Sequence, residues 1–105
     1  MYWLVTALPL KDRLADLEKQ LRAEAFVDLR PFGKSLTLGL AGARIDPAGM
    51  ATWEEEDYCV PPLAEERAAV LDKYFTGIEV EAVDKGDGWR QISKLPPLFP
   101  SLSES

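Results

Sequence analysis

The first eight residues form an almost unbroken apolar run that only Thr6 interrupts and that Pro9 ends. The run contains β-branched and aromatic side chains and shows no alternation of polar and apolar positions. This pattern is typical of a strand that is covered on both faces or has a neighbour along each edge. We therefore expect residues 1–8 to form a central strand, with the rest of the chain packed beside or over it.

Two helices are predicted. The first covers residues 11–25, where leucines recur at helical spacing and charged residues fill the other positions. Its leucine stripe is expected to lie on the sheet. The second covers residues 63–76, because Pro62 suits a first helical turn, apolar residues recur behind it, and Gly77 suits the position after the last turn.

The remaining segments suggest strands and loops. Residues 26–32 and 35–45 predict a β-hairpin, whose first strand Pro31 would confine to a sheet edge. Residues 78–82 alternate between apolar and acidic side chains, and a turn over residues 85–88 predicts that residues 89–92 return beside them. Residues 46–62 are expected to be a long loop, in which Thr52 could begin a helical turn.

The order strand–helix–strand, then strand–helix–strand, predicts an α+β fold of the ferredoxin-like (split β-α-β) plan. We expect a mostly antiparallel sheet of about five strands, two helices on one face and a C-terminal β-hairpin. Residues 1–94 would form one α+β domain, and residues 95–105 an extended tail rich in proline and serine. The other sheet face would be uncovered although Tyr2 or Trp3 must point there, which predicts a homodimer.

Composition narrows the function. The chain has 105 residues, which suits one domain, and a net charge of −6 disfavours binding to nucleic acids and to anionic membranes. It has no histidine, so the commonest acid–base residue and metal ligand is missing. No apolar stretch reaches membrane-spanning length and no signal peptide is expected, which predicts a cytoplasmic protein. The absence of asparagine favours a thermophilic source, although a GC-rich genome gives a similar bias.

An acidic group and a cysteine are the first candidates for a site. The acidic group comprises Asp46 and residues 54–57, and carboxylates of this kind bind Mg²⁺ or Ca²⁺. Consecutive glutamates cannot all converge on one ion, so we interpret the run as a solvated helix start and predict no metal. Cys59 is interpreted as a buried, inert thiol, because its acidic neighbours should raise its pKa.

A ligand or a protein partner would be bound by aromatic and charged residues of the loops. The candidates are Arg44, Trp53, Asp57, Tyr58, Trp89 and Arg90. Aromatic residues are common at interfaces but also cover the ends of small cores, and scattered arginines are commonly solvated surface charges. No catalytic residue and no cofactor are predicted.

The sequence therefore favours a small non-enzymatic binding or regulatory module that acts through protein–protein or small-ligand contacts. The alternative is a small dimeric α+β barrel-type enzyme with an apolar substrate cavity under residues 46–62, which rests on fold analogy. A closed cavity with convergent polar groups beneath that loop would favour the enzyme, and a filled interior would favour the binding module.

Overall fold

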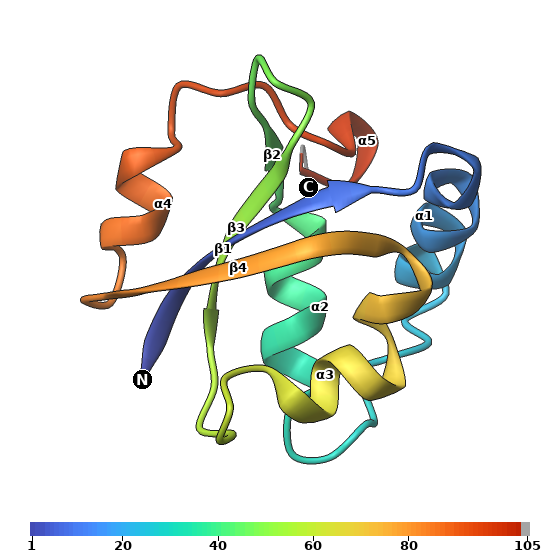
Figure 1. The fold of residues 1–105 in the computed structure, drawn as a ribbon. Helices are drawn as coiled ribbons and strands as arrows, with labels where there is room; N and C mark the ends of the chain where they lie inside the picture. The colour runs from blue at the N-terminus through green and yellow to red at the C-terminus, as the bar shows by residue number, and fades with distance from the viewer. Residues whose placement is uncertain (104–105) are drawn as a thin grey trace.

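A four-stranded antiparallel sheet forms the centre of the computed structural model, which describes residues 1–103 (Figure 1). Its strands are β1 (Tyr2–Pro9), β2 (Arg44–Ile45), β3 (Ala51–Glu56) and β4 (Phe75–Val83). They lie in the order β2-β3-β1-β4, so β1 pairs with β3 along one edge and with β4 along the other. The prediction of a central N-terminal strand is confirmed.

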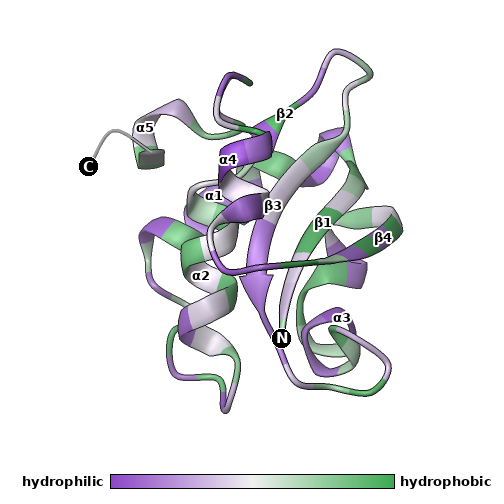
Figure 2. Cartoon of the chain, turned by 90° about the vertical axis from the view of Figure 1, so that its left-hand side faces the viewer, coloured by the Kyte–Doolittle hydropathy of each residue, from purple (hydrophilic) through white to green (hydrophobic). Residues whose placement is uncertain are grey.

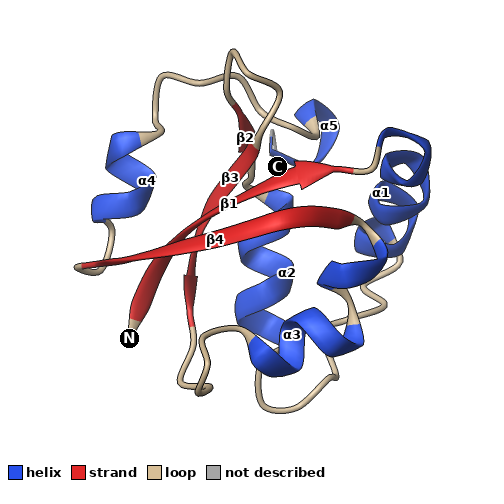
Figure 3. Cartoon of the chain, viewed as in Figure 1, coloured by secondary structure: helices blue, strands red, loops and turns tan. Residues whose placement is uncertain are grey.

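The helices are short. They are α1 (Leu14–Arg22), α2 (Gly33–Ala41), α3 (Ala64–Ala69), α4 (Asp87–Gln91) and α5 (Pro100–Ser103), with 3₁₀ turns at Lys11–Arg13 and Leu71–Lys73 (Figure 3). The α+β class and the antiparallel sheet are confirmed. Within residues 1–103 the sheet has four strands, where about five were predicted.

One core joins the helices to the sheet. Leu17 and Leu21 of α1 are buried, which confirms the predicted leucine stripe. They share a cluster with Val5 of β1 and with Trp53 of β3, whose indole ring lies 5.3 Å from the ring of Phe75. Leu36 and Leu40 of α2 belong to the same cluster, as do Leu63 and Val70, which flank α3, so these helices cover one face of the sheet.

The predicted hairpin over residues 26–45 is wrong, because residues 33–41 form α2. Leu36 and Leu40 are fully buried one helical turn apart, whereas Leu38 between them is 74% exposed. Gly39 lets α2 approach β3, since a Cβ there would lie 2.7 Å from Cδ1 of Trp53. Leu36 and Leu40 therefore form the buried face of a helix, although leucine at alternate positions is also the pattern of a strand.

Two other predicted elements are also corrected. The helix predicted over residues 63–76 ends early, because β4 already begins at Phe75. Gly77 has a φ of +60° and lies where the pairing between β1 and β4 shifts register, so it forms a β-bulge and not a helix end. The C-terminal hairpin strand predicted over residues 89–92 is instead part of α4 and the residue that follows it.

The predicted loop over residues 46–62 contains β3. Residues 51–55 of this strand are all buried, including two of its three consecutive glutamates, Glu54 and Glu55. Figure 2 shows this hydrophilic end of β3 lying between α2 and β1. The interpretation of a solvated helix start is therefore wrong.

The C-terminal segment is attached to β2 and its neighbours. The N–H of Ile45 donates to the carbonyl of Pro96 at 2.9 Å, and the N–H of Leu98 donates to the carbonyl of Ala43 at 2.8 Å. Phe99 is buried in the core. The prediction of an extended tail is wrong over Pro100–Ser103, which form α5. Residues 104–105 lie outside the described part, and the division at residue 94 stays a prediction.

The side chains of β1 that face away from the core form a mixed surface. Tyr2, Leu4 and Thr6 are half-buried and Leu8 is 45% exposed. The homodimer expected from this face stays a prediction. Among the described residues, no helix combines the length and the apolar character needed to cross a membrane.

A hydrogen bond between Tyr74 and α1 allows a first prediction. The Tyr74 hydroxyl donates to Asp16 Oδ2 at 2.7 Å, and this bond is the largest cause that lowers the pKa of Asp16. Its stabilising effect is present above the ordinary aspartate pKa of 3.8 and is lost as pH falls through the lowered value. Tyr74→Phe is expected to lower the urea midpoint at pH 7 and to lower it less at strongly acidic pH.

Tyr58→Phe is the matched control for this prediction. The Tyr58 hydroxyl also donates to a carboxylate, Glu56 Oε2 at 2.7 Å, but both side chains lie at the surface. Its urea midpoint should stay close to that of the unaltered chain. Equal effects of the two substitutions at pH 7 would contradict the role given to Tyr74.

Candidate functional site

Asp57 organises the loop that follows β3. Its N–H donates to the carbonyl of Met1 at 3.0 Å. Its carboxylate oxygen Oδ2 accepts hydrogen bonds from the N–H groups of Cys59 at 3.0 Å and Leu63 at 2.8 Å. Leu63 is fully buried with a left-handed φ of +64°, a conformation that side chains rarely adopt without support from their surroundings. The loop therefore holds the Asp57 carboxylate in one position.

Glu66 and Glu55 complete a buried group that we call the carboxyl cluster: Glu55, Asp57 and Glu66. Glu66 lies on α3 with no exposed surface, and its Oε1 accepts a hydrogen bond from the Cys59 thiol at 3.7 Å. Its carboxyl also contacts those of Asp57 and Glu55. Glu55 enters from β3, where its Oε1 accepts from Trp53 Nε1 at 2.9 Å.

The cluster contains polar atoms without partners. Among residues 1–103, the buried side-chain polar atoms with no hydrogen-bonding partner are Trp3 Nε1, Glu55 Oε2 and Glu66 Oε2. Trp3 lies directly opposite Glu55 in the pairing of β1 with β3. No ion pair of the described part involves a cluster carboxyl. Carboxyl groups in mutual contact repel one another unless a proton or a cation lies between them.

The pKa values follow from this arrangement. Burial, and then contact with Asp57 and Glu55, raises the pKa of Glu66 to about 9. Burial also raises the pKa of Glu55. Burial alone would raise the pKa of Asp57, but its hydrogen bonds with Glu66 and with the N–H groups of Leu63 and Cys59 outweigh that effect and lower it. Asp57 is therefore the ionised member and Glu66 the protonated one at neutral pH.

A cleft of about 400 Å³ opens beside the cluster. It is lined by Pro31, Phe32, Ser35, Glu56, Asp57, Tyr58, Cys59 and Glu65. Four of these side chains are acidic or a thiol, two are aromatic, and none is basic. The cleft therefore offers a negatively charged, partly aromatic surface, and Cys59 and Asp57 connect it to the buried carboxyls behind.

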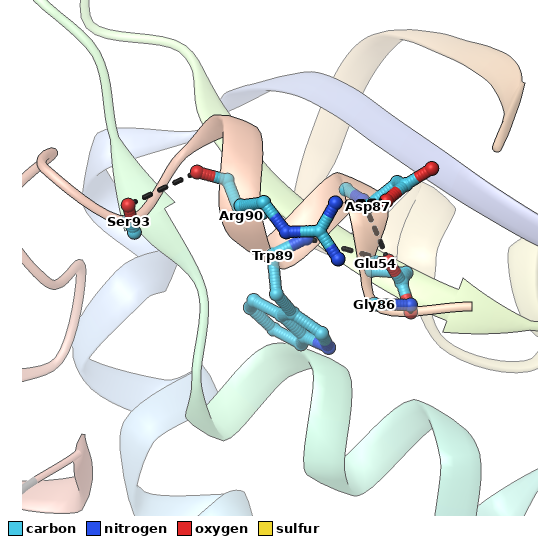
Figure 4. A network of polar contacts seen from close by, with 7 residues as sticks. Glu54, Gly86, Asp87, Trp89, Arg90 and Ser93 are labelled. Atoms are coloured by element: carbon cyan, nitrogen blue, oxygen red, sulfur yellow. Dashed lines mark hydrogen bonds and ion pairs between the residues drawn. The ribbon is translucent and has the colours of Figure 1, made fainter. Parts of the chain in front are cut away.

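Glu54, on the opposite face of β3, belongs to a separate network (Figure 4). Its carboxylate accepts hydrogen bonds from the N–H groups of Gly86 at 2.9 Å, Gly88 at 2.7 Å and Trp89 at 3.3 Å. Figure 4 shows the Trp89 ring turned toward α2, where a Cβ on Gly42 would lie 3.2 Å from it. Glu54 thus attaches α4 to the sheet.

The structure brings together two of the six candidate residues, Asp57 and Tyr58, which both line the cleft. Trp53 is buried in the core. Arg44 lies on β2 and donates to the carbonyl of Leu95 at 2.8 Å. Trp89 and Arg90 lie on α4, where Arg90 is exposed and pairs with Asp87. These four do not line the cleft.

Sequence reasoning missed the roles of Glu55, Cys59 and Glu66. The expectation of a buried thiol is wrong, because Cys59 is half-buried and lines the cleft. The expected rise of its pKa is confirmed: a backbone hydrogen bond at Glu65 lowers the pKa of Cys59, but burial and the carboxyls of Asp57 and Glu66 raise it to about 11. The signal available was the succession of acidic residues next to the cysteine. It could not be used because Glu66, the third partner, lies on a separate helix.

Comparisons of the chain with known protein families, with curated proteins and with solved structures gave no match. The function is therefore inferred from the geometry and chemistry of the cleft.

Proposed function

We propose that the chain is a small binding module, without catalytic activity, whose ligand is a small cation that enters the cleft beside Asp57 and Cys59. One observation carries the proposal: buried carboxyl oxygens face one another behind an acidic cleft, and none of them is paired with a lysine or arginine in the described part of the chain. A cation supplies the charge that such a group lacks. The net charge of −6 favours the approach of the same ligand.

The lining of the cleft supports a small ligand rather than a macromolecule. The cleft holds about 400 Å³, which is the size range of small-ligand sites. Phe32 and Tyr58 contribute aromatic surface beside Glu56 and Glu65. Aromatic faces and carboxylates together attract metal ions and organic ammonium groups and repel phosphates.

The alternative, an enzyme with an apolar cavity, has less support. The cleft under the second half of the 46–62 segment is acidic, and Arg44 does not reach it. A thiol nucleophile needs a lowered pKa, whereas burial and acidic neighbours raise that of Cys59 to about 11. These observations favour binding over covalent catalysis.

We also propose that the fold follows the ferredoxin-like plan. The elements succeed one another as strand, helices, two strands, helix and strand, if α1 and α2 are counted together. The sheet order places β1 between β3 and β4, as expected for a split β-α-β arrangement. The additions to that plan are α4 and α5, which follow the last strand.

The proposed binding is tested by two-dimensional NMR of the ¹⁵N-labelled chain with three separate probes: Zn²⁺, Ca²⁺ and spermidine, all as chloride salts. At least one probe is expected to give saturable shifts confined to the amides of the non-proline residues within 31–35 and 56–66. Saturable shifts elsewhere, or none with any probe, would overturn the proposal.

A pair of double variants provides the control. Glu56→Gln with Glu65→Gln removes two charges from the cleft and should weaken binding of every probe that binds. Glu79→Gln with Glu81→Gln removes two charges from β4, outside the cleft, and should leave the affinity nearly unchanged. Equal weakening by both pairs would indicate unspecific attraction to the acidic surface and would contradict a site in the cleft.

A further inference from the structure

Three side chains beside the cleft have the composition and spacing of a metal site. A carboxylate oxygen of Asp57, the Sγ of Cys59 and a carboxylate oxygen of Glu66 all lie within 4.8 Å of one another. They come from the loop after β3 and from α3, so the fold brings them together from two parts of the chain. We propose that Asp57, Cys59 and Glu66 coordinate a thiophilic divalent cation of the Zn²⁺ class, an inference that rests on the proposed cation binding.

The spacing agrees with tetrahedral coordination. With zinc about 2.3 Å from sulfur and about 2.0–2.2 Å from oxygen, two such ligands lie roughly 3.5–3.7 Å apart. The Sγ of Cys59 and the Oε1 of Glu66 are 3.7 Å apart. These two ligands therefore already have the separation that a zinc ion requires, and the Asp57 oxygen lies within 4.8 Å of both.

The unpartnered oxygens are a second, independent observation. Glu66 has no exposed surface, lies against Asp57, and its Oε2 has no hydrogen-bonding partner. A buried carboxyl oxygen without a donor loses its hydration and gains nothing in return. Glu55, 2% exposed, has the same deficiency and contacts Glu66 from behind. A cation bound between Asp57 and Glu66 would give these buried oxygens a partner of opposite charge.

The loop already orients one ligand. Asp57 Oδ2 accepts hydrogen bonds from the N–H groups of Cys59 and Leu63, which fix the position of the carboxylate. Outer contacts of this kind fix the direction of a ligand and strengthen metal binding. Glu55 is in turn held by the indole N–H of Trp53 at 2.9 Å, so it supports Glu66 from the core side.

The donor set selects the metal. Mg²⁺ and Ca²⁺ prefer six or more oxygen ligands and gain little from sulfur. One thiolate with two carboxylates suits Zn²⁺ or its substitute Co²⁺. Binding displaces the thiol proton of Cys59 and the carboxyl proton of Glu66 into solvent. Cys59 and Asp57 both line the cleft, so a fourth position on that side is open to water or to a ligand.

The test is a titration of the whole chain, freed of metal by a chelator and then dialysed, with Co²⁺ followed by displacement with Zn²⁺. We expect one equivalent of Co²⁺ to bind and to produce a thiolate-to-cobalt charge-transfer band that Zn²⁺ abolishes. Cys59→Ser should remove the band, and Glu66→Gln should weaken Co²⁺ binding about 100-fold. Glu79→Gln makes the same chemical change at an exposed position of β4, outside the cleft, and should retain both the band and the affinity.

The outcomes separate this inference from the proposed function. If Co²⁺ and Zn²⁺ do not bind, or if Cys59→Ser and Glu66→Gln bind them as the unaltered chain does, the coordination site is wrong. Spermidine or Ca²⁺ shifts at the cleft in the NMR experiment would still support cation binding in that case. If no cation of any kind shifts the cleft residues, both proposals fail.

Discussion

Glu66→Gln is expected to make the metal-free chain more stable at pH 8, although it changes the chemistry of a fully buried side chain. The amide has the shape of the protonated carboxyl that Glu66 carries next to the Asp57 carboxylate. Its NH₂ group can donate to Asp57 and Glu55, and its oxygen can accept from the Cys59 thiol. A glutamine has no carboxyl proton to lose as pH rises, so it never becomes a second negative charge that repels the Asp57 carboxylate.

The free energy of unfolding of the metal-free chain is expected to depend on pH through Glu66. The pKa of Glu66 is raised from an ordinary 4.5 to about 9, so the folded chain keeps a proton that the unfolded chain releases. The resulting stabilisation is complete below the ordinary value and is lost as pH rises toward 9. The free energy of unfolding of the metal-free chain should therefore decrease between about pH 5 and pH 9, and the Glu66→Gln variant should show a flatter profile.

Urea denaturation in the presence of a chelator, at pH 5, 7 and 9, measures both quantities. At the highest pH the Glu66→Gln variant should exceed the unaltered chain by about 1–3 kcal/mol. Glu65→Gln makes the same chemical change at the adjacent exposed position and should shift neither the level nor the slope. A Glu66→Gln variant that is less stable than the unaltered chain at pH 9 would contradict the arrangement of the carboxyl cluster.

The central strand and the first helix could be predicted because each has a pattern that packing enforces directly. An apolar run without alternation can be satisfied only where both faces, or both edges, of a strand are covered, and β1 has a strand on each side. The leucines of α1 repeat over two turns, which is long enough to define a helix. Each of these two patterns lies within a single contiguous stretch of sequence.

The α2 segment could not be predicted, because its apolar pattern suits two structures equally well. Leucine at every second position over residues 36–40 also places two leucines one helical turn apart. The choice depends on Gly33 and Gly39, which permit close contact with neighbouring backbone and with Trp53. That contact is a property of the tertiary structure, and a short segment does not encode it alone.

The candidate site was hidden by a rule that is usually sound. Charged residues are mostly solvated, so three glutamates followed by an aspartate suggest surface. In this chain Glu54 and Glu55 lie on opposite faces of β3, and each is buried against a different partner: the N–H groups around α4 for Glu54, and α3 for Glu55. Successive side chains of a strand point to opposite faces. Glu54 therefore holds α4 on one face, and the adjacent Glu55 joins the carboxyl cluster on the other.

Glu54→Gln is expected to detach α4 from the sheet. The Glu54 carboxylate accepts N–H hydrogen bonds at both oxygens, Oε2 from Gly86 and Oε1 from Gly88 and Trp89. An amide has only one oxygen, so its NH₂ group must face an N–H donor at the other position. Glu54 is 6% exposed, and water cannot readily replace the lost acceptor. The unfolding free energy should fall by about 2–3 kcal/mol.

The stability lost in Glu54→Gln is expected to include local opening of α4, which hydrogen exchange can measure. The amides of residues 86–92 should exchange much faster in Glu54→Gln. The amides of β1 and β3 should exchange faster only by the factor that the lower free energy of unfolding accounts for. Glu56→Gln is the matched control, because Glu56 lies two residues along the same strand face and its carboxylate accepts from the exposed Tyr58 hydroxyl. Its stability should change by less than about 0.5 kcal/mol. Unchanged exchange over residues 86–92 in Glu54→Gln would mean that the packing of Trp89 against α2, and not the carboxylate, holds α4 in place.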